Sequence, residues 1–333
     1  MTILEILKSL DIPIKTKGNY ITKIGDIGED GKIFYYWQFY IDNKISMIPI
    51  DKFLVNPSAK LIELKYEIPP EGIERQKILL TGSEGFIGRN LYPKLSSHYL
   101  VRYDLVLGNN ITDSRKLEMF SKGCNAIIHL AGKVLVDESI RKPLEYFDDL
   151  KGTLNILEVA RKFDIPKILY ASSAAVYNLQ SPYGLVKLQG EEWMKMYSEL
   201  YGIKTLSMRF FNIYGPFNNK GIIYHFIKAA KEKESLIVYG DGNQIRDYVH
   251  VNDVTDFISS ILNDNFECET VDIGTGVGSS VNDIINILKI LSKQEIKTIN
   301  RKAKFNDSDY SVAQLFWKFK PKINLFDGIK GLL

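Results

Sequence analysis

The sequence is poor in residues that build covalent or metal-bound frameworks. It has two cysteines, Cys124 and Cys268, and four histidines among 333 residues. With no CxxC motif and no cluster of histidine and cysteine, neither a disulfide framework nor a zinc site is indicated. We therefore expect two reduced thiols and no bound metal.

Long apolar runs are missing as well. No stretch approaches the roughly 20 apolar residues that span a bilayer. Glu5 and Lys8 place charges where a secretory signal would be apolar. The 43 basic and 40 acidic side chains are interspersed, with a net charge of +3, which does not indicate a nucleic-acid-binding surface. The sequence predicts a cytoplasmic protein that binds neither membranes nor nucleic acid.

Residues 1–75 differ from the rest of the chain. They predict a short amphipathic helix at the start, turns rich in glycine and aspartate around residues 25–31, and two β-like runs at 33–41 and 45–50. Residues 69–72, Pro-Pro-Glu-Gly, are typical of a linker. We expect a small β-rich α+β module of unknown role. The aromatic run 34–40 fits a core or interface better than a sugar-binding surface.

From residue 76 onward, apolar strand-like runs alternate with helical stretches. The runs are residues 77–81, 100–104, 126–130, 167–172 and 204–209. Such alternation predicts a doubly wound parallel sheet of the Rossmann type, with helices on both faces. We expect this core to cover about 76–210 with returning segments at about 245–275. A smaller C-terminal substrate-binding lobe would comprise about 211–244 and 276–333.

A glycine-rich turn follows the first of these runs. Residues 81–88, Thr-Gly-Ser-Glu-Gly-Phe-Ile-Gly, place Gly82, Gly85 and Gly88 where a tight turn lets the backbone approach a pyrophosphate at a helix N-terminus. Asp104, at the end of the next strand, is placed to accept hydrogen bonds from the adenosine ribose and would repel a 2′-phosphate. The alternative is a surface aspartate after a structural turn. NAD is favoured over NADP.

Three polar residues form a candidate catalytic group. Tyr183 and Lys187 are four residues apart, which places both side chains on one helical face. An ammonium and the positive nicotinamide ring would both favour the phenolate of Tyr183, which could then take a proton from a substrate hydroxyl. Ser173 follows the strand at 167–172 and would hydrogen-bond the reacting oxygen. Without this context the tyrosine and lysine would be an ordinary packed and solvated pair.

Together these motifs resemble the extended short-chain dehydrogenase/reductases, specifically the nucleotide-sugar epimerase/dehydratase family, over about residues 76–331. Asp149 stands where that family usually has asparagine. By this resemblance the cofactor contacts are Gly82, Gly85, Phe86, Ile87, Gly88, Asp104, Asn110, Ile111, Leu130, Ala131, Gly132, Asp149, Tyr183, Lys187 and Phe210. The expected substrate contacts are Lys133, Val134, Ser173, Asn212, Tyr239, Arg246 and Asp309. Arg246 could donate hydrogen bonds to two diphosphate oxygens at once, or form a structural ion pair with Asp247.

The resemblance also bears on the reaction. The family's dehydratases carry Asp-Glu directly after the catalytic hydroxyl residue, whereas this chain has Ala174 and Ala175. Residues 129–146 look like the UDP-galactose/UDP-glucose 4-epimerase branch. The resemblance therefore implies C4 epimerisation of a UDP-hexose through a 4-keto intermediate. A nucleotide-sugar reductase or dehydrogenase and a non-catalytic dinucleotide-binding scaffold remain alternatives.

Two further expectations concern the surroundings of this site. Only residues 177–182 separate Val176 from Tyr183, fewer than in most relatives, so the sugar pocket is either opened or covered by the N-terminal module. The helical stretches near 143–163 and 184–200 carry apolar residues and pair across a dimer in the family. The resemblance therefore implies a homodimer.

Overall fold

The computed structural model describes residues 75–292, 295–303, 310–316 and 318–333, together with the backbone of six strands before residue 67. The chain divides into two compact units, Met1–Arg75 and Gln76–Leu333. Among the described residues, no helix combines the length and apolar character needed to cross a membrane.

The first unit contains two small antiparallel sheets. One has the order β1-β2-β3 and the other β5-β4-β6, formed by β1 (Ile14–Lys17), β2 (Tyr20–Ile24), β3 (Ile27–Gly28), β4 (Trp37–Ile41), β5 (Lys44–Ile45) and β6 (Ile62–Tyr66). The predicted runs at 33–41 and 45–50 overlap β4 and β5, while β1, β2 and β6 had not been predicted and β3 lies where turns were expected. The predicted first helix and the linker at 69–72 lie outside the described residues.

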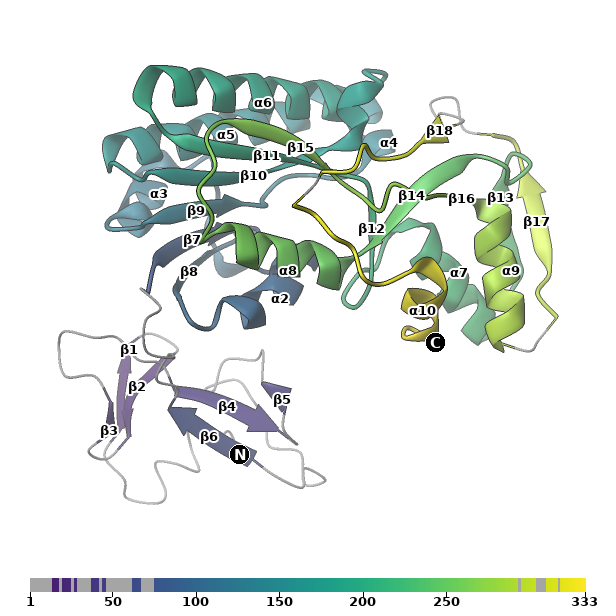
Figure 1. Ribbon diagram of the computed structural model, residues 1–333, viewed down its shortest axis with the longest axis horizontal. Coiled ribbons are helices and arrows are strands. Elements are labelled where there is room, and N and C mark those ends of the chain that lie inside the picture. The colour runs from purple at the N-terminus through teal and green to yellow at the C-terminus, as the bar shows by residue number, and fades with distance from the viewer. Residues whose placement is uncertain are drawn as a thin grey trace. The chain divides into compact units, whose positions relative to one another are not determined.

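A six-stranded parallel sheet forms the centre of the second unit (Figure 1). Its order is β15-β11-β10-β9-β7-β8, and its members are β7 (Lys77–Thr81), β8 (Tyr99–Tyr103), β9 (Ala126–His129), β10 (Lys167–Ser173), β11 (Lys204–Phe210) and β15 (Glu269–Ile273). The chain runs outward from β7 to β8 and then returns to place β9 on the other side of β7. This reversal creates a topological switch point, where α/β proteins bind ligands.

Helices cover both faces of this sheet, as predicted (Figure 1). Leu79, Ile127 and Ile168 pack in one core with residues of α3 (Ser114–Ser121), α5 (Pro143–Lys162) and α6 (Pro182–Tyr201). Leu80 and Ile128, on the opposite face, pack with residues of α2 (Phe86–Leu91) and α8 (Val251–Ile261). Adjacent strand residues thus point into different cores, which is why the strands are apolar throughout.

Local signals fix the ends of the helix that carries the candidate base. The Ser181 side chain accepts a hydrogen bond from the backbone N–H of Gly184, Pro182 occupies the first turn, and Gly202 ends α6 with a φ of 70°. These are a side-chain N-cap, a residue whose φ suits the first turn, and a glycine C-cap. Together they hold Tyr183 on the first turn of the helix.

The C-terminal lobe packs around its own apolar core. Phe226 of α7 (Gly221–Glu232), Val238 of β13 (Leu236–Tyr239) and Ile284 of α9 (Val281–Ser292) lie in this core with Ile329 of α10 (Leu325–Lys330). The remaining strands of the lobe are β12 (Asn212–Tyr214), β14 (Ile245–His250), β16 (Gly278–Ser280), β17 (Thr298–Arg301) and β18 (Tyr310–Ser311).

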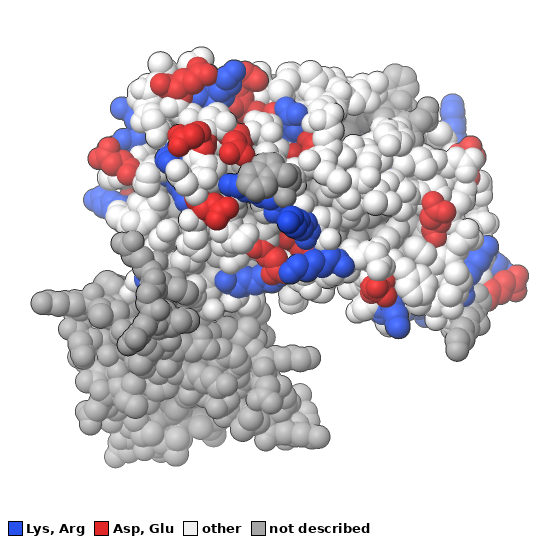
Figure 2. Space-filling view, in the orientation of Figure 1, with Lys and Arg blue, Asp and Glu red and all other residues white. Residues whose placement is uncertain are grey.

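The segment 245–275, expected to return to the Rossmann core, divides between two sheets. β14 joins the small sheet with β12, β16 and β18, whereas α8 and β15 return to the large sheet. The short elements that remain are the helix α4 (Val136–Arg141) and the 3₁₀ turns η1 (Tyr92–Leu95), η2 (Leu105–Leu107) and η3 (Ala174–Tyr177). On the face of the second unit seen in Figure 2, acidic and basic side chains are interspersed.

Candidate active site

A cavity of about 1360 Å³ opens at the C-terminal ends of the parallel strands and extends to the C-terminal lobe. This exceeds the roughly 300–1,000 Å³ of a pocket for one small ligand, so the cavity has room for a dinucleotide and a second molecule. Every predicted cofactor residue lines it. Of the predicted substrate residues, Lys133, Val134, Ser173, Asn212 and Arg246 line it too.

The glycine-rich turn is built so tightly that side chains are excluded. Gly82 has a φ of +70°, and a Cβ there would lie 2.7 Å from the backbone nitrogen of Ala131. A Cβ on Gly88 would lie 2.3 Å from the carbonyl oxygen of Gly82. Both distances are far below van der Waals contact, so the first turn of α2 can pack against the end of β7 only with glycine at these positions.

The carboxylate of Asp104 is held at the end of β8. Its Oδ2 accepts from the backbone N–H of Glu84 at 2.9 Å, and its Oδ1 accepts from the N–H of Val106 at 2.9 Å. Each oxygen can still accept another hydrogen bond, which suits a ribose diol. Asn110 and Ile111 lie beside it, fixed through their carbonyl oxygens by Tyr103 Oη at 2.8 Å and Asn155 Nδ2 at 2.9 Å.

A buried histidine, which the sequence argument did not single out, orders the loop after β9. His129 Nδ1 lies 2.8 Å from Thr81 Oγ1, and its Nε2 lies 3.1 Å from Thr153 Oγ1. Burial, and then the charge of Lys187, lower the pKa of His129 to about 3, so the ring is neutral. Because Thr81 Oγ1 also accepts from the N–H of Ala131 at 3.2 Å, this network positions the predicted loop of Leu130, Ala131 and Gly132.

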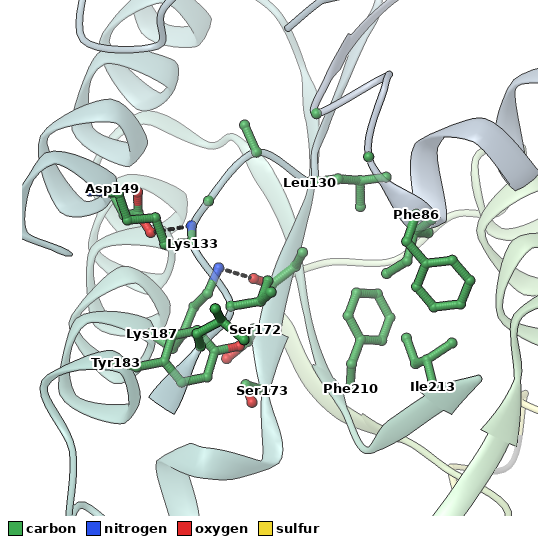
Figure 3. A pocket seen from close by; sticks show the side chains of 18 of the residues that line it. Phe86, Leu130, Lys133, Asp149, Ser172, Ser173, Tyr183, Lys187, Phe210 and Ile213 are labelled. Atoms are coloured by element: carbon green, nitrogen blue, oxygen red, sulfur yellow. Dashed lines mark hydrogen bonds between the residues drawn. The ribbon is translucent and has the colours of Figure 1, made fainter. Parts of the chain in front are cut away.

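The three candidate catalytic residues converge in the middle of the cavity (Figure 3). Tyr183 and Lys187 project from α6 toward the end of β10, where Ser173 lies. Ser173 Oγ accepts from the backbone N–H of Ala175 at 3.2 Å, and its hydroxyl acts to lower the pKa of Tyr183. Lys187 Nζ donates to the carbonyl oxygen of Ala171 at 2.7 Å. The predicted group is therefore brought together by one helix and one strand.

Burial has the largest effect on the electrostatics of this group. Burial raises the pKa of Tyr183 to about 12; the hydrogen bond with Ser173 opposes this, and the charge of Asp149 adds to it. Burial also lowers the pKa of Lys187, while Asp149 and Glu191 oppose that change. The phenol is thus protonated near neutral pH in the protein alone, because desolvation of the phenolate outweighs the favourable contacts.

Asp149 faces this group from α5. Its Oδ2 accepts from the backbone N–H of Lys133 at 2.7 Å, and it lies with Lys187 around Gly132, whose Cβ would be 3.3 Å from Asp149 Oδ2 and 3.4 Å from Lys187 Nζ. Burial raises the pKa of Asp149, and the charge of Lys187 is the largest opposing effect. The Lys133 side chain turns to α5, donating to the carbonyl oxygen of Glu145 at 2.6 Å.

A second polar network, also missed from the sequence, supports the strand ends. Glu191 is buried, accepts from Ser172 Oγ, and pairs with Arg209 at 2.7 Å. Arg209 Nη1 donates to Tyr177 Oη at 2.9 Å, and Tyr177 donates to Asp272 Oδ1 at 2.7 Å. Tyr177, at the start of the short loop before Tyr183, lines the cavity in this fixed position.

The substrate side is only partly as predicted. Asn212 Nδ2 donates to the carbonyl oxygen of Asp247 at 3.1 Å, and the Asp247 carboxylate accepts from the N–H groups of Thr275 and Gly276 at 2.8 Å each. Tyr239, by contrast, is not among the described residues that line the cavity, because Leu236 and Val238 point into the lobe core and strand alternation turns Tyr239 outward. Asp309 lies outside the described residues.

A parallel sheet with this glycine turn and a serine, tyrosine and lysine group at its strand ends defines a dinucleotide-dependent enzyme of the short-chain dehydrogenase/reductase type. Comparison with known proteins agrees. The model of the NAD dependent epimerase/dehydratase family matches residues 78–274, and a model described as a domain of unknown function matches residues 1–67. The chain belongs to the NAD-dependent epimerase/dehydratase family, and the fold class and the cofactor NAD expected from its sequence are confirmed.

Individual relatives extend over most of the second unit. A Methanocaldococcus jannaschii protein provisionally named UDP-glucose 4-epimerase is 35% identical over 303 residues, covering 77% of this chain and 97% of the relative. A UDP-glucuronate 4-epimerase of Thermodesulfobacterium geofontis is 31% identical over 229 residues, covering 62% and 70%. The structure of Thermotoga maritima UDP-glucose 4-epimerase with UDP-glucose is 25% identical, with a TM-score of 0.71, and covers 76% of this chain and 96% of that chain.

Proposed function

We propose that this protein is an NAD-dependent nucleotide-sugar epimerase that inverts C4 of a UDP-hexose through a 4-keto intermediate. The observation that carries the proposal is the group of half-buried Ser173 and buried Tyr183 and Lys187, which lines a cavity large enough for two ligands. The relatives named as 4-epimerases of UDP-glucose and UDP-glucuronate support the same reaction type. The choice among hexoses is a matter for experiment.

The residues on the cofactor side fit NAD. The turn leaves no space for a Cβ at Gly82 and Gly88, so backbone N–H groups can approach a pyrophosphate. Asp104 would hold the adenosine ribose. Phe86 and Phe210 line the cavity opposite Tyr183 and Lys187 (Figure 3). When bound, NAD supplies the hydride acceptor and a positive charge beside the phenol.

The protein's own groups would handle the proton. Tyr183 receives the proton of the sugar hydroxyl and returns it to the ketone oxygen, while Ser173 keeps that oxygen within hydrogen-bonding reach. Lys187 contributes a buried positive charge anchored on the carbonyl oxygen of Ala171. Since burial raises the pKa of Tyr183 to about 12, the phenolate forms only when additional positive charge is present. This couples proton transfer to an occupied cofactor site.

The residues after Ser173 favour epimerisation over elimination. Ala174 and Ala175 line the cavity there, and neither can act as the acid or base that dehydration of the sugar needs. Inversion at C4 needs only the proton-transfer group, the cofactor and space for the ketone to turn over. The short loop between Tyr177 and Tyr183 is consistent with such space.

Turnover with defined sugars tests the proposal. We would incubate the full chain separately with UDP-glucose, UDP-galactose, UDP-N-acetylglucosamine and UDP-glucuronate, without added reductant, and follow the sugar protons by NMR. A C4 epimer should appear, and Tyr183→Phe should lower kcat by about 10²–10⁴ because general base catalysis contributes that much. Tyr201→Phe, a change at the exposed end of the same helix, should have no effect. Net production of NADH would instead identify a dehydrogenase.

We also propose a homodimer formed through α5 and α6. Leu144 is 86% exposed, Phe147 62% and Leu200 62%, which leaves apolar side chains of both helices uncovered. A second copy of these helices would bury them. Static light scattering at micromolar concentration should give twice the chain mass, and a monomer mass would refute this assembly.

A further inference from the structure

An ion pair between Glu84 and Arg102 lies next to Asp104. Glu84, within the glycine-rich turn, donates its backbone N–H to Asp104 Oδ2 at 2.9 Å. Its side-chain Oε1 accepts from Arg102 Nη2 and also from Ser83 Oγ at 3.2 Å. One residue therefore touches both Asp104 and a guanidinium group.

Arg102 is held close to the position of the adenosine ribose. It lies on β8, and Asp104 follows that strand in extended backbone two residues later, so both side chains leave the chain on the same side. Its guanidinium lies 5.0 Å from the centre of the Tyr92 ring, and the side chains of Arg102 and Glu84 are each 15% exposed. Glu84 and Asp104 line the cavity, whereas Arg102 is not among the described lining residues.

The charges of these groups bear on which dinucleotide binds. A free ribose diol donates hydrogen bonds to a carboxylate, while a 2′-phosphate carries close to two negative charges and is recognised best by a guanidinium. Here the carboxylates of Glu84 and Asp104 both line the cavity, and the guanidinium of Arg102 is already paired with that of Glu84. Glu84 thus adds a negative charge that repels a 2′-phosphate. Its ion pair also keeps Arg102 from binding that phosphate.

We propose that Glu84 is a second selector for NAD against NADP, and that it acts by holding Arg102 in an ion pair away from the ribose 2′ position. This inference rests on the proposed placement of the adenosine ribose at Asp104. It concerns dinucleotide binding alone, so it stands or falls independently of which sugar is converted.

Isothermal titration calorimetry of the nucleotide-stripped full chain tests this. In Glu84→Gln, the ratio of the Kd for NADP to the Kd for NAD should fall by at least about tenfold, a modest change in binding free energy. The double variant Glu84→Gln/Arg102→Met should lose most of that gain, because the phosphate ligand is gone. Glu118→Gln removes an acid of another ion pair, on α3, away from the cavity, and should leave the ratio unchanged.

Two results would overturn the inference. An unchanged ratio in Glu84→Gln would show that Glu84 does not select the cofactor. An equal gain in Glu84→Gln and in the double variant would show that Arg102 does not act. A protein that binds NAD with these ratios but converts none of the sugars would count against the proposed epimerase and not against the selector.

Discussion

The two halves of the cavity are built in different ways. On the cofactor side, the turn at Gly82–Gly88 and the end of β8 belong to one strand–helix–strand unit, and backbone N–H groups hold the Asp104 carboxylate there. On the side proposed for the sugar nucleotide, the lining residues Asn212 of β12, Arg246 of β14 and Tyr310 of β18 come from segments far apart in sequence. The first half is specified locally and already formed. The second depends on how the C-terminal lobe packs. Relatives that share the cofactor can therefore differ in substrate through changes in this lobe.

Of the changes that separate the two halves, breaking the cofactor half should give the largest effect on binding. In Gly88→Ala, the new Cβ would lie 2.3 Å from the oxygen of Gly82 and 2.7 Å from that of Ser83. Because both atoms are backbone, the turn must move, and overpacking of about 1–3 kcal/mol predicts NAD binding weaker by up to about 100-fold. Calorimetry with NAD measures this loss.

Gly331→Ala is the matched control for that variant. Its Cβ would meet its nearest atom at 3.6 Å, an ordinary contact, and the residue does not line the cavity. NAD affinity should stay at the wild-type value. If Gly88→Ala also bound NAD normally, the turn would not be the rigid pyrophosphate cradle that its geometry indicates.

Breaking the sugar half should leave the cofactor half intact. Arg246 lines the cavity on β14, and loss of a charge-assisted fork to a diphosphate costs about 1.5–3 kcal/mol. Arg246→Met should therefore raise the KM for the UDP-sugar by about 10- to 100-fold. Arg246→Lys should lie between it and the wild type. Calorimetry should show NAD binding unchanged in both, and equal weakening of NAD and sugar would contradict the division into two halves.

Sequence reasoning succeeded where chemistry is carried by neighbours in the chain. The apolar run at β7, the glycines after it and the helical spacing of Tyr183 and Lys187 each follow from local geometry. The networks of His129 and Glu191 were missed because their partners, Thr153 and Arg209, lie on other elements. A lone histidine in an apolar strand shows nothing of the hydroxyls that satisfy it.

Where Tyr239 points could not be predicted, for a related physical reason. Tyr239 is the last residue of β13. Its side chain points outward because the other face of β13 packs on α7 and α9, and this packing is not visible in the sequence. The sequence also could not show the depth at which Tyr183 is buried, which raises the pKa of its phenol to about 12.

At the junction of the two halves, Asp149→Asn should shift the pH dependence. Asp149 raises the pKa of Tyr183, so replacing the carboxylate by an amide should lower it and move the rising limb of kcat to lower pH by about half a unit. The amide oxygen can still accept from the N–H of Lys133. Asp148→Asn, at the exposed neighbour, is the matched control and should shift the profile less. Identical profiles for wild type and Asp149→Asn would show that this carboxylate does not influence the base.

The smallest effect is expected from a change at Tyr239. This variant tests whether the end of β13 belongs to the sugar half of the cavity. Tyr239 is 38% exposed at the end of β13, which pairs with β17, and it does not line the described cavity. Tyr239→Ala should therefore change KM and kcat for the UDP-sugar by less than about twofold, within the range of ordinary surface substitutions. A KM raised tenfold or more would mean that the end of β13 closes over the bound nucleotide. In that case the lobe would complete its binding site only when the sugar nucleotide is present, and the contrast between a preformed cofactor half and an assembled sugar half would be stronger still.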